Sequence, residues 1–189
     1  GGSGWLGKSL INTLLNGDNL VLEEFKPINS QLFALEYDKN YFDNDKIKII
    51  KGDIRSIKDC NHFMKNNING ILYHCAGIIH PNKVSDFYEV NLKGTINIVN
   101  SAINNNIKKI VVVSSNSPIG CNKSNQYLFT EKSKYNPYMN YGNSKKLMEE
   151  FLIKKIKEGI DITIIRSPWF YGENMPFRQL TFYKMVKNG

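Results

Sequence analysis

The chain has 189 residues, of which 41% are hydrophobic, so it is long enough to bury one α/β core and has an ordinary globular composition. No apolar run approaches the roughly 18 residues that a membrane span needs, which argues against a membrane-spanning chain. The net charge of +8 comes mostly from lysines scattered along the chain, with few arginines, so nucleic acid is not an expected partner.

Short apolar, β-branched runs alternate along the chain with amphipathic segments, and the two patterns predict strands and helices respectively. Strands are predicted at Leu32–Tyr37, Ile47–Ile50, Ile71–His74, Ile110–Ser114 and Ile162–Ile165. Helices are predicted around 6–15, 88–99 and 147–156, and a further helical stretch precedes Gly189. This alternation predicts an α/β fold in which a Rossmann-like, doubly wound parallel sheet lies between two layers of helices.

The chain opens on a glycine-rich segment, Gly1-Gly2-Ser3-Gly4-Trp5-Leu6-Gly7, and an amphipathic helix follows at once. Such a turn brings backbone amides and the helix N-terminus close to a pyrophosphate. We predict a dinucleotide-binding turn; a tight turn without a ligand is the alternative. Because this motif normally follows a central strand, we expect residues 1–189 to form an incomplete domain whose sheet lacks its middle strand and exposes unpaired edges.

The cofactor preference depends on the residue that ends the strand after the glycine turn. An acid there binds the ribose 2′-hydroxyl of NAD and repels the 2′-phosphate of NADP. Glu36, in Leu35-Glu36-Tyr37-Asp38, is the candidate, and a surface acid is the alternative. Its distance from Gly7 exceeds the usual spacing of about 20 residues, which an insertion around Asp18–Ser30 would explain. NAD is therefore favoured, with NADP not excluded.

A polar stretch from Cys121 to Pro137 predicts a long loop, which either borders the active site or is a surface excursion. The chain has three cysteines, Cys60, Cys75 and Cys121, an odd number without metal-ligand spacing. We predict free thiols in a reducing compartment, no metal site and a cytoplasmic location.

Seven motifs, in their order along the chain, resemble those of the extended short-chain dehydrogenase/reductases, the family of nucleotide-sugar epimerases and dehydratases. They are Gly1 to Gly7, Gly52-Asp53-Ile54-Arg55, His74-Cys75-Ala76-Gly77, Asn91-Leu92-Lys93-Gly94-Thr95, Val113 to Gly120, Tyr141-Gly142-Asn143-Ser144-Lys145 and Arg166 to Gly172. The Tyr-x-x-x-Lys motif alone is not specific, because a second such pair, Tyr183 and Lys187, also occurs. The resemblance is therefore carried by the order of all seven motifs. The chain has Pro118 and Ile119 where the family has Val and Tyr, which leaves the substrate class open.

The resemblance implies that NAD lies along these motifs. Beyond Gly1, Gly4, Trp5, Leu6, Gly7 and Glu36, the residues implied to contact it are Asp53, Ile54, Cys75, Ala76, Gly77, Asn91, Ser114, Tyr141, Lys145 and Pro168. Asn91 either bends a helix beside the site or is a satisfied core amide, and Trp169 and Phe170 either wall the nicotinamide pocket or belong to the core. The family often forms homodimers, so a homodimer is a further expectation.

The expected catalytic residues are Ser115, Tyr141 and Lys145. Tyr141 and Lys145 are four residues apart, so on a helix they share a face, and a nearby ammonium lowers the pKa of a phenol. We expect Tyr141 to be the general acid/base, Lys145 to tune it and to hold the nicotinamide ribose, and Ser115 to orient the substrate oxygen. Ser114 and, more weakly, Ser117 are alternatives to Ser115.

The expected function is hydride transfer between NAD and a hydroxyl or carbonyl of a small substrate, in a reductase, epimerase or dehydratase and with a nucleotide sugar as one candidate substrate. Two other functions compete: a non-catalytic NAD(P)-binding sensor or scaffold module on the same fold, and nucleic-acid binding through the lysine excess. The intact Ser115, Tyr141 and Lys145 favour the enzyme. His74 has no carboxylate partner within reach in the sequence, so a packed structural histidine is expected there.

Overall fold

The computed structural model describes residues 1–17, 25–37, 42, 44–65, 67–122, 124, 128–172 and 175–188. Its elements are α1 (Trp5–Asn16), β1 (Leu32–Glu36), β2 (Ile47–Lys51), α2 (Ile57–Met64), β3 (Ile71–His74), η1 (Phe87–Gly94), α3 (Thr95–Asn104), β4 (Lys109–Ser115), α4 (Met139–Lys157), β5 (Ile162–Ser167) and α5 (Phe177–Lys187). The five predicted strands are therefore confirmed, with small shifts at their ends. The proposed insertion lies partly, and Asp38 wholly, outside the described residues.

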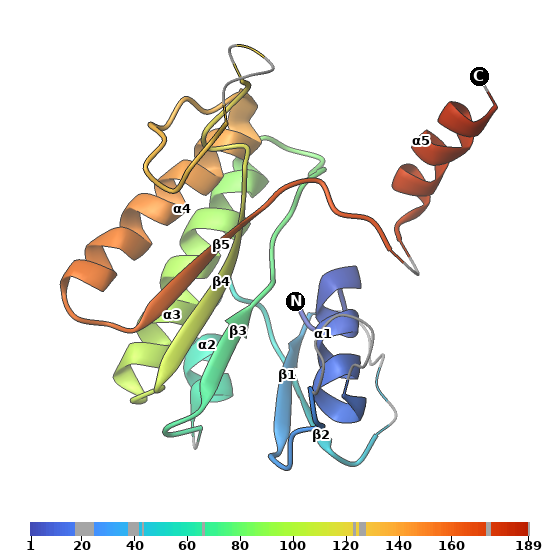
Figure 1. Cartoon of the computed structure of the whole chain (residues 1–189). Coiled ribbons are helices and arrows are strands. Elements are labelled where there is room, and N and C mark those ends of the chain that lie inside the picture. The colour runs from blue at the N-terminus through green and yellow to red at the C-terminus, as the bar shows by residue number, and fades with distance from the viewer. Residues whose placement is uncertain are drawn as a thin grey trace.

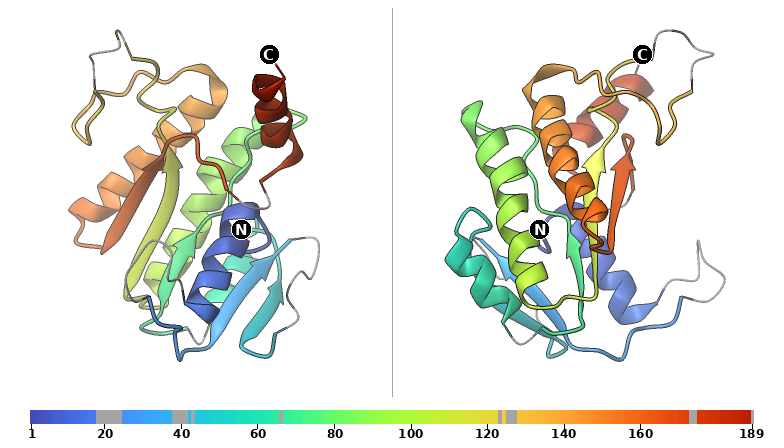
Figure 2. Two further views of the ribbon diagram at one scale, coloured as in Figure 1. Left: turned by 45° about the vertical axis from the view of Figure 1, so that its right-hand side comes forward. Right: turned by 90° about the vertical axis from the view of Figure 1, so that its left-hand side faces the viewer.

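The strands form two parallel sheets, one of β1 and β2 and one in the order β3-β4-β5. Helices α2, η1, α3 and α4 cover one face, and α1 lies on the other (Figures 1 and 2). This is the expected α/β layering. In β3, β4 and β5, buried apolar residues face the helices, and most of the core gathers there between sheet and helices.

A gap separates the two sheets. Among the described residues β1 pairs only with β2, and β3 pairs only with β4, so each presents a free edge toward the other sheet. A cavity of about 560 Å³ lies between them, lined by apolar side chains that include Leu14, Ala34 and Leu72. The sheet thus has unpaired edges at the place where the glycine motif calls for a central strand, as expected from the sequence.

Two further sequence expectations can be compared with the fold. All three cysteines are free thiols, as predicted, and the described residues contain no cluster of His, Cys, Asp or Glu that could hold a metal ion. Within the described part of the chain, no helix combines the length and the apolar character needed to cross a membrane.

Candidate active site

The glycine-rich turn is closely packed and leads directly into α1. A Cβ on Gly7 would lie 2.1 Å from the carbonyl oxygen of Gly1, and one on Gly1 would lie 2.4 Å from the amide nitrogen of Ala76. Only glycine fits at either position. The amides of Trp5, Leu6 and Gly7 belong to the first helical turn, which contains no acidic residue. The first turn of a helix directs its backbone amides outward along the helix axis, so this turn presents donors to an anion.

Glu36 ends β1 beside the glycine turn and is only 3% exposed. Neither of its carboxylate oxygens accepts a hydrogen bond from the described residues, and a Cβ on Gly2 would lie 3.0 Å from Glu36 Oε1. A surface acid is therefore not what the structure shows. Burying a carboxylate without a partner is costly, so this group is suited to accept hydrogen bonds from a ligand.

Asp53 and Ile54 follow β2, at the same edge of the molecule. Arg55 donates to Asp53 through Nη2 at 2.6 Å and through its backbone amide at 2.8 Å, and its Nη2 also reaches the Tyr37 hydroxyl at 3.2 Å. Partial burial raises the pKa of Asp53, but the bonds from Arg55 outweigh this and hold the pKa below its ordinary value. Ile54 packs against Gly94, where a Cβ would lie 2.7 Å from its side chain.

The segment after β3 runs from the glycine turn to the helices. The backbone of Cys75 and Ala76 lies against Gly1. A Cβ added to Gly77 would lie 3.2 Å from Asn91 Oδ1 and 3.4 Å from Lys145 Nζ. Burial raises the pKa of the Cys75 thiol. The Cys75–Gly77 segment therefore connects the glycine turn with Asn91 and Lys145 at the carboxyl ends of the strands.

Asn91 combines both of the roles left open by the sequence. It is fully buried in the π-helix η1, and its amide accepts from Ile78 N at 2.8 Å and donates to Ile78 O and Ser144 Oγ. Its hydrogen-bonding groups are thus satisfied, and the helix is distorted at this point. Insertions of this kind in helices are frequent at functional sites.

The two serines at the end of β4 point to different partners. Ser114 Oγ donates to the buried Glu149 carboxylate at 2.5 Å, whereas Ser115 Oγ bonds Ser117 Oγ at 3.0 Å and accepts from Ser117 N at 3.1 Å. Ser115 also lies close enough to Tyr141 to lower the pKa of its hydroxyl. The structure therefore places Ser115 beside Tyr141 and turns Ser114 away into the interior.

Tyr141 and Lys145 lie on the first turns of α4, where a Cβ on Gly142 would come within 2.8 Å of Ser117 O. Burial raises the pKa of Tyr141, and the nearby Ser115 lowers it only in part. Lys145 Nζ donates to Val113 O at 3.1 Å, and burial lowers its pKa to about 8. The expected lowering of the Tyr141 pKa by Lys145 is absent from this arrangement, because the ammonium group is directed at the backbone of β4.

Pro168, Trp169 and Phe170 follow β5 above the glycine turn. Phe170 stacks on Trp5 with ring centroids 5.1 Å apart, and Trp169 contacts Phe182 of α5 at 5.0 Å. Because Trp169 is 66% exposed and Phe170 is also exposed, neither belongs to the core. This leaves a wall of the site as the better of the two interpretations made from the sequence.

His74 is fully buried and its Nε2 bonds Thr95 Oγ1 at 2.8 Å, while the Thr95 hydroxyl donates to Asn91 O. Burial lowers the pKa of His74 to about 3, so the ring is neutral. It is a packed histidine, as expected. The sequence interpretation missed Glu149, although its position four residues after Lys145 on one helix face was a usable signal.

Comparison with known proteins identifies related sequences over the whole chain. The profile of the 3-beta hydroxysteroid dehydrogenase/isomerase family matches residues 1–189. An uncharacterised protein of Sinorhizobium fredii, y4nL, is 39% identical over 193 residues, which cover 100% of this chain and 54% of that protein. A UDP-glucose 4-epimerase of Vibrio cholerae is 24% identical over 202 residues, which cover 100% of this chain and 56% of that protein. The chain thus spans about half the length of these relatives.

Solved structures share the fold at low sequence identity. DesIV, a dTDP-glucose 4,6-dehydratase of Streptomyces venezuelae solved with NAD, superposes with a TM-score of 0.79 at 21% identity, covering 100% of this chain and 61% of that one. The enzyme WbmG of Bordetella bronchiseptica, solved in complex with NAD, gives a TM-score of 0.78 at 18% identity, covering 100% and 58%.

Proposed function

Since the chain belongs to the 3-beta hydroxysteroid dehydrogenase/isomerase family, we propose that it binds NAD and transfers a hydride to or from a hydroxyl- or carbonyl-bearing carbon of a small substrate. One observation carries this proposal. Ser115 and Tyr141 lie side by side at the carboxyl edge of the three-stranded sheet. Lys145 is one helical turn from Tyr141, and Gly77 lies between Lys145 and the glycine turn.

The residues present fit a dinucleotide. The backbone amides of Leu6 and Gly7 at the start of α1 would hold the pyrophosphate, and the glycine cradle leaves no room for side chains there. The buried, unpaired Glu36 carboxylate would accept from the ribose 2′-hydroxyl, which favours NAD over NADP. Asp53 and Ile54 would contact the adenine end, and the Cys75–Gly77 strip would lie along the nicotinamide half. When bound, NAD supplies the hydride acceptor.

Tyr141 would move the proton at the substrate oxygen. A phenol with an ordinary pKa of about 10 is protonated at neutral pH, and burial raises the pKa of Tyr141 further, so its hydroxyl carries the proton that is donated when a carbonyl is reduced. Ser115 would hydrogen-bond the same oxygen and orient it. For Tyr141 to act as a base, a cation must approach the phenol, and Lys145 can do so by leaving Val113 O for the nicotinamide ribose hydroxyls and Tyr141.

A nucleotide sugar is the proposed substrate class, because several relatives are named as UDP-glucose 4-epimerases and a structural neighbour as a dTDP-glucose 4,6-dehydratase. The chain departs from the family motif at Pro118 and Ile119, and Ile119 is buried beside the cavity next to Arg166. We expect these two residues to alter the substrate pocket and to leave the proton-transfer residues unaffected.

Replacing Tyr141 with Phe tests this function. With UDP-glucose and NAD as the probes and chromatographic loss of UDP-glucose as the readout, Tyr141→Phe should lower the rate about 10²- to 10⁴-fold, the range for a positioned general acid/base. The matched control is Tyr183→Phe in the second Tyr-x-x-x-Lys pair, on α5 away from Ser115, which should keep the rate. Equal rates in the two variants would contradict the role of Tyr141. NAD binding without turnover by any of these proteins would favour the non-catalytic module.

A further inference from the structure

The inner face of α4 contains a third functional position. Tyr141, Lys145 and Glu149 follow one another at intervals of four residues, so all three project from the same side of the helix. Lys145 is 4% exposed and Glu149 is completely buried. Buried charges are retained only where they are paired and hydrogen-bonded, which makes the partners of Glu149 informative.

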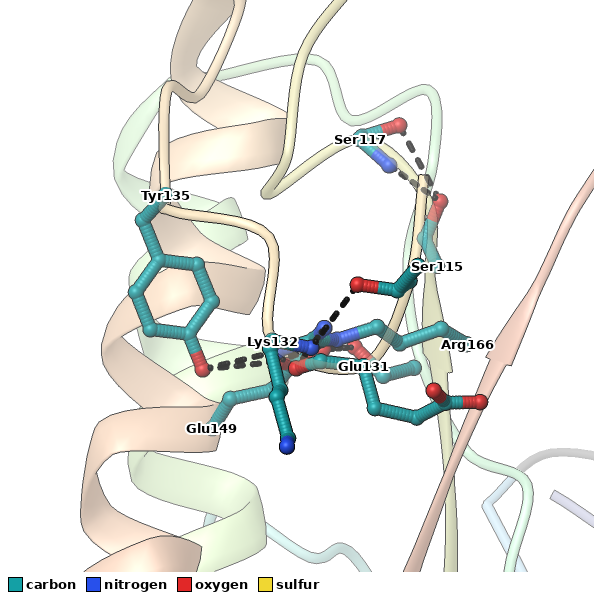
Figure 3. A network of polar contacts seen from close by, with 9 residues as sticks. Ser115, Ser117, Glu131, Lys132, Tyr135, Glu149 and Arg166 are labelled. Atoms are coloured by element: carbon teal, nitrogen blue, oxygen red, sulfur yellow. Dashed lines mark hydrogen bonds and ion pairs between the residues drawn. The ribbon is translucent and has the colours of Figure 1, made fainter. Parts of the chain in front are cut away.

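Glu149 receives hydrogen bonds from three separate parts of the chain (Figure 3). Ser114 Oγ of β4 donates at 2.5 Å, the Tyr135 hydroxyl at 2.8 Å, and Arg166 of β5 donates through Nε at 2.9 Å and Nη2 at 2.7 Å. Four donors saturate the carboxylate and fix its orientation. Burial raises the pKa of Tyr135 to about 12, and its bond to Glu149 adds to this, so Tyr135 remains a donor.

Each of these bonds fixes a piece of the site. Ser114 directly precedes Ser115, so holding its hydroxyl sets the end of β4 and with it the direction of the Ser115 side chain. Tyr135 and Arg166 fix the segment that returns to α4: the guanidinium lies 5.3 Å from the centre of the Tyr135 ring, and Nη1 donates to Glu131 O at 3.3 Å.

The same segment shapes a cavity of about 400 Å³ that adjoins Glu149 and Arg166. Its remaining wall comes from Asn116 and Ile119, in the turn that follows Ser115, and from Phe129 to Glu131. Glu149 and Arg166 therefore line this cavity, and the bond from Ser114 to Glu149 also anchors the strand end that carries Ser115. Displacing Glu149 would change both together.

We propose that Glu149 is a positioning residue of the active site, which holds Ser115 and the 128–136 segment in place relative to Tyr141 and Lys145. This inference rests on the proposed function for its catalytic meaning. A buried ion pair adds little net stability compared with apolar side chains of the same volume, so its value here is in fixing geometry.

The test compares Glu149→Gln with Glu150→Gln in the protein without nucleotide. Glu150 makes the matched control because it is exposed, pairs with Lys146 at 3.6 Å and loses the same charge. Two readouts are followed: the titration of Lys145 by the ¹³Cε chemical shift of lysine-labelled protein, assigned with Lys145→Met, and amide hydrogen exchange of residues 128–136.

Burial lowers the pKa of Lys145 to about 8, and the nearby Glu149 and Cys75 oppose this effect by raising it. His74 also lies near Lys145, at the end of β3, but its ring is neutral. Removing the Glu149 charge should therefore lower the titration midpoint further, with no change in Glu150→Gln. Exchange of residues 128–136 should rise about tenfold, as for the loss of one strong hydrogen bond. A folded Glu149→Gln protein that matches Glu150→Gln in both readouts would overturn the proposal.

Tyr135→Phe provides a second variant in case Glu149→Gln does not fold. It removes one hydroxyl from the network and keeps the ring against Arg166. Exchange of residues 128–136 should again rise, and exchange equal to that of the unaltered protein would overturn the proposal. Because both readouts are taken without nucleotide, failure to bind NAD would remove the proposed function without affecting this test.

Discussion

Two neighbouring serines at the end of β4 have the same chemistry and different surroundings. The sequence named Ser114 and Ser115 as neighbours that could exchange roles, and only the packing against Glu149 separates them. Glu149 itself lies on a lysine-rich helix, where an acid is typical of a solvated surface. Its spacing from Lys145 places it on the inner face of the helix, but its burial depends on Arg166 and Tyr135, whose contacts with it the sequence does not reveal.

The buried His74 predicts a specific dependence of stability on pH. Its pKa in the folded protein is about 3 against an ordinary 6.5, so the unfolded chain binds a proton between these values that the folded protein does not. The stability contributed by neutral His74 is complete above about pH 6.5 and is lost as the pH falls toward 3. When the pH is lowered from about 7 to about 4.5, the thermal unfolding midpoint should fall by less in His74→Gln than in the unaltered protein. His62→Gln, at an exposed position in α2, should fall like the unaltered protein.

Helix α2 was not predicted, although the sequence contains two signals for it. Cys60, Phe63 and Met64 recur at helical spacing and are buried on one face. Ser56 Oγ accepts from Asp59 N at 3.3 Å, which caps the start of the helix. The predicted helix over 88–99 is present, but its first half is the π-helix η1, because the buried Asn91 and its bonds to Ile78 impose a local distortion. Residues 121–137 contain no helix or strand where the structure describes them, as predicted.

The glycine turn predicts different effects for two of its glycines. A Cβ on Gly7 would collide with Gly1 O at 2.1 Å, whereas one on Gly4 would lie 3.2 Å from the same atom and touch nothing else nearby. Gly7→Ala should cost about 1–3 kcal/mol of unfolding free energy, as overpacking does. Gly4→Ala should leave the denaturation midpoint close to that of the unaltered protein. Equal midpoints in the two variants, measured by chemical denaturation, would show that the turn is not packed as described.

At the scale of the whole molecule, the alternation of strands and helices was enough to predict a layered α/β fold with parallel strands. The structure adds the division into two sheets, with a cavity lined by residues of β1 and β3. The position of α5 was not predictable, because its contacts are made by aromatic rings of the segment after β5, such as Trp169 on Phe182. The homodimer and the cytoplasmic location stay predictions.

The central claim is that this surface binds NAD and that Glu36 selects it. Calorimetric titration of NAD and NADP into the folded protein tests it most directly, with Glu36→Ala as the variant and Glu89→Ala, an exposed acid paired with Lys93, as the control. We predict tighter binding of NAD than of NADP, and a loss of NAD affinity of about 10- to 100-fold in Glu36→Ala alone, as expected when bonds to a charged group are removed. Binding of neither nucleotide by the folded protein would contradict the account.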